Sequence, residues 1–108
     1  MNPGKLNRRI KFVYWGETYD DAGFPIEGWV TFREMWASVR GLRGREFYNA
    51  ASVQAQDDKI FNCRYFPGLT PDMYIEYQGR KFNIKSINNV NEQNIEYEIH
   101  ASEVSPSE

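Results

Sequence analysis

The sequence is poor in residues on which catalysis and metal binding most often depend, with one cysteine, one histidine and no long apolar run. A single cysteine cannot form an internal disulfide or a cysteine-based zinc cluster, so the fold should need neither an oxidising compartment nor a structural metal. No apolar segment approaches the roughly 20 residues of a membrane-spanning helix, and no long apolar segment follows the first basic residues. We therefore expect a soluble protein, made in a reducing cytoplasm, without a membrane anchor or signal peptide.

An excess of positive charge is also lacking, because the formal net charge is -2. General coating of nucleic acid depends on excess Lys and Arg that neutralise phosphates, so the charge argues against that role. The distribution is uneven, with a net +3 over residues 1–45 and a net -5 over residues 46–108. One half of the chain could thus attract the other half of a neighbouring copy.

What the sequence does contain is typical of one small β-rich domain. Its 108 residues suit a single core, and residues 1–108 are read as one domain. Aromatic residues make up 16% of the chain, which favours strands. Alternation of apolar and polar residues predicts strands at 8–15, 29–40, 59–66, 73–78, 81–87 and 95–101. A change in the parity of the second strand predicts a bulge near Arg33 and Glu34.

Three segments between and after these strands have different compositions. Residues 17–28 are rich in Asp, Gly and Pro, which predicts a mobile loop. Residues 41–58 form an insertion in which Ala, Gln and Glu predict a helix from about Arg45 to Gln56. Residues 102–108 are polar and are expected to form a disordered tail.

Six short strands favour a mainly β fold, a small antiparallel β-barrel with one short helix inserted between strands two and three. Closure of a barrel removes the exposed sheet edges that a short chain could not otherwise protect. The apolar positions that share the inward parity predict one core, made of Phe12, Met73, Ile75, Tyr77, Phe82, Ile84, Ile95, Tyr97 and Ile99.

Catalytic equipment is hard to assemble from these residues. Cys63 lies on the apolar face of its strand and is expected to be a core residue, while His100 lies on a polar face as a surface histidine. No phosphate-binding glycine loop or calcium loop is present, and the pairs Asp20-Asp21 and Asp57-Asp58 look like solvated turns. We expect no enzyme activity, no metal and no cofactor.

The aromatic residues leave a second class open, a small barrel that binds single-stranded nucleic acid by stacking bases. Most of them share faces with Ile or Met, and only Trp36, Phe66 and Tyr74 are expected to point outward. Packing in the core is therefore the favoured interpretation.

The candidate contact residues gather around the insertion, where Arg40, Arg43 and Arg45 crowd one end and Asp57 and Asp58 close the other. Taken alone, the arginines fit a solvated loop or a contact with phosphate or carboxylate. The basic end of one copy could also meet acidic groups of another copy, and of the two ends only the basic one suits phosphate.

The order of several short motifs resembles the head-tail joining protein family of tailed bacteriophages and prophages. The similarity covers roughly residues 6–104. The matching pieces are Leu6-Asn7-Arg8-Arg9-Ile10, Met35-Trp36-Ala37-Ser38-Val39, Gly44-Arg45-Glu46-Phe47 with Ala50, Cys63-Arg64-Tyr65, Leu69-Thr70-Pro71-Asp72-Met73, and Gly79-Arg80-Lys81-Phe82-Asn83-Ile84.

This resemblance implies a structural adaptor, made in the bacterial host and placed in the virion connector between head and tail. It implies a ring of copies that helps to retain DNA and to receive the tail. The implied partners are other copies of the chain, the portal-side adaptor, the tail completion protein and packaged double-stranded DNA. The resemblance offers no catalytic residue.

Overall fold

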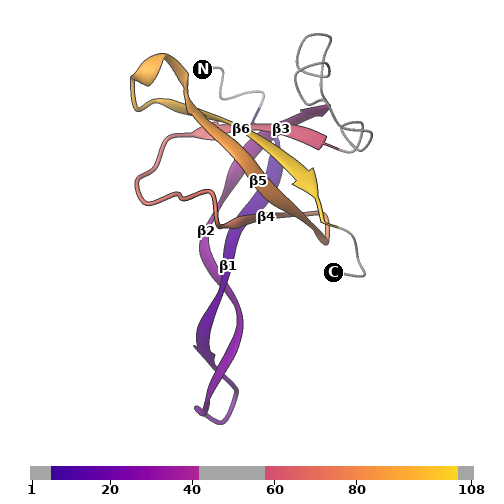
Figure 1. The fold of residues 1–108 in the computed structure, drawn as a ribbon, viewed down its shortest axis with the longest axis vertical. Coiled ribbons are helices and arrows are strands. Elements are labelled where there is room, and N and C mark those ends of the chain that lie inside the picture. Colours follow the sequence, from indigo (N-terminus) through magenta and orange to yellow (C-terminus); the bar gives the residue numbers. More distant parts are fainter. Residues whose placement is uncertain (1–5, 42–57, 105–108) are drawn as a thin grey trace.

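Six antiparallel strands close into a barrel in the computed structural model, which describes residues 6–41 and 58–104 (Figure 1). The order around the barrel is β1-β2-β3-β6-β5-β4. A short 3-10 helix, η3 (Val90–Glu92), joins the last two strands. The strands are β1 (Arg8–Tyr19), β2 (Pro25–Gly41), β3 (Asp58–Arg64), β4 (Tyr74–Tyr77), β5 (Arg80–Asn89) and β6 (Glu96–Glu103). The predicted mainly β barrel is confirmed, whereas the predicted helix at residues 45–56 lies outside the described residues.

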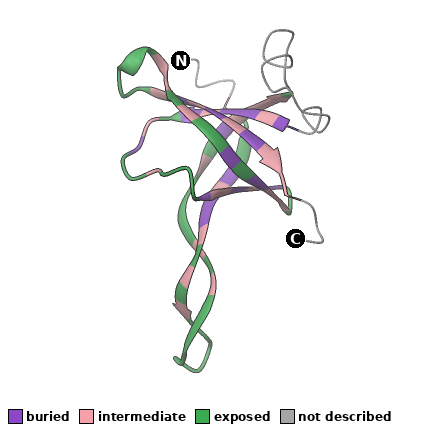
Figure 2. Ribbon diagram, in the orientation of Figure 1, coloured by how far each residue is buried: buried purple, intermediate pink, exposed green. Residues whose placement is uncertain are grey.

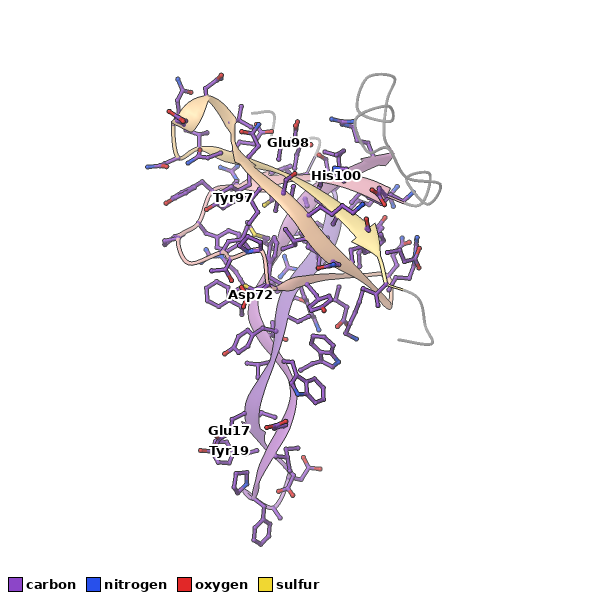
Figure 3. The ribbon with its side chains drawn as sticks, in the orientation of Figure 1. Glu17, Tyr19, Asp72, Tyr97, Glu98 and His100 are labelled. Atoms are coloured by element: carbon purple, nitrogen blue, oxygen red, sulfur yellow. The ribbon has the colours of Figure 1, made fainter. Side chains whose placement is uncertain are left out.

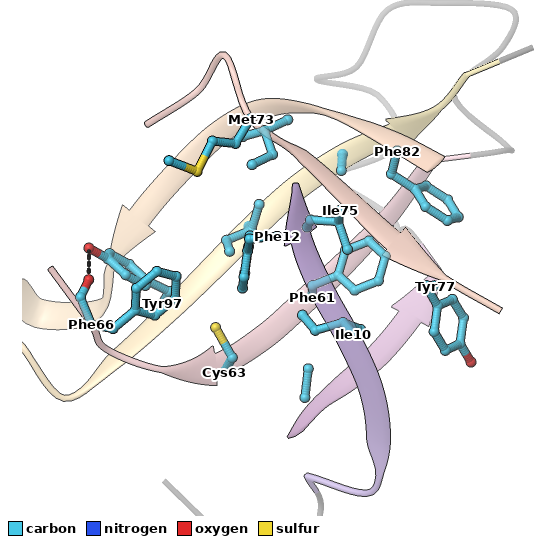
Figure 4. Packing of buried hydrophobic residues seen from close by; sticks show 14 residues of the cluster. Ile10, Phe12, Phe61, Cys63, Phe66, Met73, Ile75, Tyr77, Phe82 and Tyr97 are labelled. Carbon is cyan, nitrogen blue, oxygen red and sulfur yellow. Dashed lines mark hydrogen bonds between the residues drawn. The ribbon is translucent and has the colours of Figure 1, made fainter. Parts of the chain in front are cut away.

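The core fills the barrel because alternate residues of each strand point inward (Figures 2 and 4). Phe12, Phe61 and Phe82 are completely buried, and the Phe61 and Phe82 rings meet edge to face with centroids 5.2 Å apart. The predicted core is confirmed for every member except Ile95, which is 55% exposed. Ile95 was assigned wrongly because β6 begins one residue later, at Glu96.

Strands β1 and β2 are longer than the barrel and continue out of it as a two-stranded arm, which we define as residues 14–32 (Figure 1). Barrel contacts stop near its base, where Val13 pairs with Tyr74 of β4. Beyond that point β1 and β2 pair only with each other, as far as Tyr19 opposite Pro25. The sequence predicted a loop over residues 17–28, and this was wrong for all but the turn at residues 20–24, because the turn-forming residues cluster at the tip.

The predicted bulge in β2 is confirmed and marks the place where the arm leaves the barrel. Phe12 is opposite Arg33 while Val13 is opposite Thr31, so Phe32 is the extra residue. A bulge bends its strand and raises the local twist. The two β1 residues that flank this register shift, Phe12 and Val13, are both buried, and Phe12 belongs to the core cluster.

The predicted tail from residue 102 was wrong at its start, because β6 continues to Glu103. Two contacts hold this end of the strand against β5. The Arg80 guanidinium donates to Glu103 at 2.6 and 2.9 Å, and the Val104 backbone N–H donates to the Lys81 carbonyl oxygen at 2.8 Å. Residues 105–108 lie outside the described residues. None of the helices among the described residues has the length and apolar character needed to cross a bilayer.

Candidate interaction surfaces

Most of the large apolar side chains that are exposed to solvent in the described residues lie on the arm. Phe24 is 67% exposed and Tyr19 is 65% exposed. Single exposed apolar residues are normal on a protein surface, but a group of them on one element often marks an interaction site. In Figure 2 exposed and intermediate residues alternate along the arm, its tip is exposed and no residue of the arm is buried. The exposed apolar residues of the arm are Trp15, Tyr19, Phe24, Ile26, Trp29 and Phe32.

An aromatic cluster at the base fixes the arm to the barrel. Trp15 and Trp29 are directly opposite across the hairpin, with ring centroids 5.4 Å apart at 83°. Trp29 in turn meets Tyr74 of β4 at 5.2 Å, and the Lys81 ammonium lies 4.9 Å from the Trp29 ring. Edge-to-face aromatic pairs and cation-π contacts each contribute about 0.5–1.5 kcal/mol. The cluster therefore fixes the orientation of the arm relative to the barrel and stabilises a two-stranded hairpin that would be only marginally stable alone.

A side-chain cap orders the tip. One carboxylate oxygen of Asp20 accepts hydrogen bonds from the backbone N–H groups of Ala22 at 3.0 Å and Phe24 at 2.9 Å. Gly23 has a φ of +85°, a conformation that favours glycine. The turn thus leaves the Phe24 ring exposed at the tip of the arm.

The arm is acidic as well as apolar. Residues 14–32 contain Glu17, Asp20, Asp21 and Glu27 but no Lys or Arg. Figure 3 shows Glu17 and Tyr19 far out on this arm, away from the labelled residues of the barrel. Such a surface repels phosphate and suits a basic or apolar protein partner.

Two open hollows on the barrel have cations in their lining, four in the first and one in the second. The first, which we call the polar hollow, encloses about 270 Å³ and is lined in part by Arg8, Arg40, Lys59 and Arg80. The second, the aromatic hollow, encloses about 410 Å³ and is lined by Leu6, Asn7, Trp36 and Arg64. Trp36 is 52% exposed, as predicted, and the Arg9 guanidinium carbon lies 5.2 Å from its ring.

Of the predicted contact residues, Arg40 lies in the polar hollow and Asp58 does not reach the surface. Arg40 forms an ion pair with Glu98 of β6 at 3.7 Å, and its side chain is 26% exposed. Asp58 is 1% exposed, so in the protomer it has internal partners. Arg43, Arg45 and Asp57 lie outside the described residues.

Asp58 is the centre of a polar cluster that sequence reasoning missed. Its carboxylate accepts a hydrogen bond from the Ser102 hydroxyl at 2.7 Å, lies 2.7 Å from His100 Nε2 and pairs with the Lys85 ammonium at 3.3 Å. Burial acts to raise the pKa of Asp58, but these hydrogen bonds and the Lys85 charge outweigh it, so the pKa lies below its usual value. The partners come from β5 and β6, and only the barrel topology brings them together.

Cys63 and His100 are of the residue types most often found in nucleophilic catalysis, but they lie in different environments and are not paired in the barrel. Cys63 is completely buried, and burial raises the pKa of its thiol to about 12. His100 contacts Asp58 and is opposite Ile60, three positions along β3 from Cys63. Within residues 6–41 and 58–104, no group of three or more His, Cys, Asp or Glu residues is placed to hold a metal ion.

The fold is a small closed β-barrel with a projecting arm that is apolar and acidic, and with surface hollows whose lining includes cations. The phage head completion protein family model matches residues 1–104. The chain therefore belongs to the phage head completion protein family, a family of bacteriophage structural proteins.

One curated protein is similar to this chain in sequence, and two solved structures are similar to it in fold. The chain is 28% identical over 89 residues to head completion protein gp7 of Enterobacteria phage HK97, covering 78% of this chain and 80% of gp7. Its fold is similar to the solution structure of protein SF1141 from Shigella flexneri 2a, with a TM-score of 0.70 and 24% identity over 98% of this chain and 99% of that protein. A chain in the virion of a native gene transfer agent particle has the same fold, with a TM-score of 0.56 and 20% identity over 92% of this chain and 96% of that one.

Proposed function

We propose that this protein is a structural adaptor that assembles as a ring in the connector between the phage head and tail. Membership of the head completion family supports a role in the virion, and the observation that carries the adaptor role is the projecting arm. The hairpin carries solvent-exposed Tyr19, Phe24 and Ile26 at its far end, and such a group of exposed apolar residues is typical of a surface that binds another protein.

The proposed partners follow from the charges of the two ends. The acidic apolar arm suits protein partners, which are other copies, the portal-side adaptor or the tail completion protein. The polar hollow, with Arg8, Arg40 and Lys59, is the described surface best suited to the phosphates of packaged DNA. Retention of DNA and reception of the tail would thus use opposite ends of one protomer.

Genetic complementation in a phage or prophage that encodes this chain tests the proposal. We expect deletion of the gene to leave heads that fail to keep DNA or to join tails, and the full chain to restore filled, tailed particles. A variant in which residues 17–28 are replaced by a two-residue turn should fold but not restore them. Normal particle yields without the protein would contradict the adaptor role.

The predicted arginines outside the described residues belong to the same proposal. Reversal of Arg43 and Arg45 to Glu should leave the melting temperature nearly unchanged, because charges in a solvated loop, one of the interpretations left open by the sequence, contribute little to stability. It should, however, impair connector completion or DNA retention. Full yields of filled, tailed particles with both reversals would remove these two residues from the proposed contacts.

The alternative, a barrel that binds single-stranded nucleic acid, has less support. Most of the exposed aromatic rings lie on the acidic arm, which repels phosphate, and Phe66, predicted to point outward, is 2% exposed. Tight, salt-dependent binding of short oligonucleotides by the isolated protein would favour this alternative over the adaptor.

A further inference from the structure

The tip of the arm and the aromatic hollow have complementary surfaces at opposite ends of the same hairpin. We propose that the arm tip of one copy docks in the aromatic hollow of the next copy, so that copies join head to tail. This inference rests on the proposed ring assembly and names the contact that would hold the ring together.

The tip offers one large ring surrounded by carboxylates. Phe24 projects from a turn that Asp20 holds in place, and Asp21 beside it is exposed. Burial of an exposed phenyl ring is a strong source of binding free energy, and aromatic residues are common at the energetic centres of interfaces. The tip therefore requires a partner site that is apolar at its centre and positive at its rim.

The aromatic hollow has these two properties. Leu6 and the exposed Trp36 ring supply apolar surface for Phe24, and the volume of about 410 Å³ leaves room for a phenyl ring. Arg64 lines the hollow, and Arg9, which pairs with Glu34 at 3.1 Å, lies over the Trp36 ring. Arginine pairs well with carboxylates through paired N–H donors, which makes Arg64 the expected partner of Asp21.

The other hollows match the tip less well. A hollow at the base of the arm, of about 340 Å³, is apolar where Trp15 and Met73 line it, but its charged lining residue is Asp72. It would repel the acidic tip. The polar hollow has the required cations, yet little apolar surface to receive Phe24.

The occupant must be a different copy because a protomer cannot bring its own tip to its own hollow. Trp36 is opposite Arg9, and β1 from Arg9 to Tyr19 spans roughly 33 Å at about 3.3 Å per residue. The aromatic cluster of Trp15, Trp29 and Tyr74 keeps the arm from folding back. A contact between two different surfaces of one chain is heterologous, and it produces a ring when the rotation between copies closes.

Cross-linking tests this contact with the full chain. Ala22→Cys places a thiol at the tip and Asn7→Cys places one at the hollow, and neither replaces a proposed contact charge. In the double variant, a short bifunctional maleimide should give a ladder of dimers, trimers and larger species, in concentrated solution or in head particles that contain the protein. Each single variant should give no ladder, and the buried Cys63 should stay unmodified.

A matched control uses the hollow at the base of the arm. The pair Ala22→Cys and Asp72→Cys should give no ladder. Absence of a ladder from the tip and hollow pair in both solution and particles would overturn the proposal, as would efficient dimers from Ala22→Cys alone, which would indicate a symmetric contact.

Charge exchange gives a second, independent readout. Asp21→Arg or Arg64→Asp alone should weaken self-association by about tenfold, and the combined exchange should restore it. Unchanged association in both single variants would also overturn the contact. If particles complete normally without the protein, the proposed function fails, and the ladder in solution still decides whether the tip binds the hollow.

Discussion

Cys63 illustrates how burial removes a reactive side chain from chemistry. It faces the barrel interior from β3, opposite Ala37 of β2 and Tyr97 of β6, and it is completely buried. Because the thiolate is the reactive form, a pKa raised to about 12 leaves almost none of it at neutral pH.

The corresponding prediction is that Cys63 is protected from thiol reagents in the folded protein. Labelling by a disulfide reagent such as dithiobis(nitrobenzoate), followed by absorbance, should be very slow in buffer and rapid in 6–8 M urea. The rate should follow the fraction unfolded as denaturant rises. Complete labelling within seconds in native buffer would show that the thiol reaches solvent without unfolding.

At Asp58 the prediction concerns pH. Its folded pKa lies below the unfolded value of about 3.9, so its ionised form stabilises the fold above that value. This contribution is lost as the pH falls through the lower, folded pKa. Asp58→Asn should reduce the free energy of unfolding by about 1–3 kcal/mol at pH 7, and the difference should shrink below pH 4.

Urea denaturation of both proteins at several pH values measures this difference. Asp21→Asn is the control, because Asp21 is exposed at the tip and should change stability little at any pH. An equal loss for Asp58→Asn at pH 3 and pH 7 would show that its effect does not depend on ionisation.

Residue by residue, the sequence predicted burial well where strand parity was unambiguous and poorly where a strand ended. Phe12 and Tyr97 followed parity, whereas Ile95 fell just before β6 and Phe66 just after β3. Phe66 is buried because it packs against Phe12 and Tyr97, whose hydroxyl donates to its carbonyl oxygen at 3.0 Å. Such contacts come from other strands, so local periodicity cannot indicate them.

Among the elements, the β1–β2 arm was the largest difference between expectation and structure. The residues 17–28 contain enough Asp, Gly and Pro to suggest a loop, but Thr18, Tyr19 and Ile26 are compatible with strands. The bulge was predictable because it changed the parity of apolar residues within one strand. The arm was not predictable, because its large apolar residues are exposed and no face of the hairpin is buried.

Ordering of the arm tip depends on Asp20, and hydrogen exchange can test this dependence. In Asp20→Ala the backbone N–H groups of Ala22 and Phe24 lose their acceptor, so their exchange should accelerate by about tenfold, equivalent to roughly 1.4 kcal/mol. The melting temperature should hardly change, because the tip does not contact the core.

Asp20→Asn retains an acceptor oxygen and should behave like the natural protein, and Asp21→Ala should also leave both amides protected. Faster exchange of barrel amides in Asp20→Ala would contradict this local role, because it would mean that the tip stabilises the barrel.

On the scale of the whole molecule, a matched pair of isoleucines tests the core. Ile84 is 4% exposed and Ile95 is 55% exposed, although both were predicted to be buried. Ile84→Ala should lower the free energy of unfolding by about 2–5 kcal/mol, whereas Ile95→Ala should change it by less than about 0.5 kcal/mol. Urea titration followed by circular dichroism compares the two variants. An equal loss of unfolding free energy in both would contradict the start of β6 at Glu96.

Closure of the barrel could be argued from six short strands, but the neighbours of each strand could not. Hairpin pairing of β1 with β2 and β4 with β5 follows from short connections. The placement of β6 between β3 and β5, and of β4 beside β1, is determined by long-range packing. This placement also explains why the Asp58 cluster was missed, since its partners lie in strands far along the chain.

The position of β6 has a consequence for the newly made chain. Because residues 96–103 fill the space between β3 and β5, a ribosome must finish and release nearly all of the described chain before the barrel can close. The β1–β2 hairpin needs only local pairing and can form much earlier. Its exposed aromatic side chains would then leave the ribosome before the rest of the chain has folded. Nascent chains on neighbouring ribosomes of one messenger RNA lie close together, which favours premature aggregation. The four carboxylates among those aromatic residues should reduce this association, because like charges on neighbouring nascent chains repel each other until β6 is made.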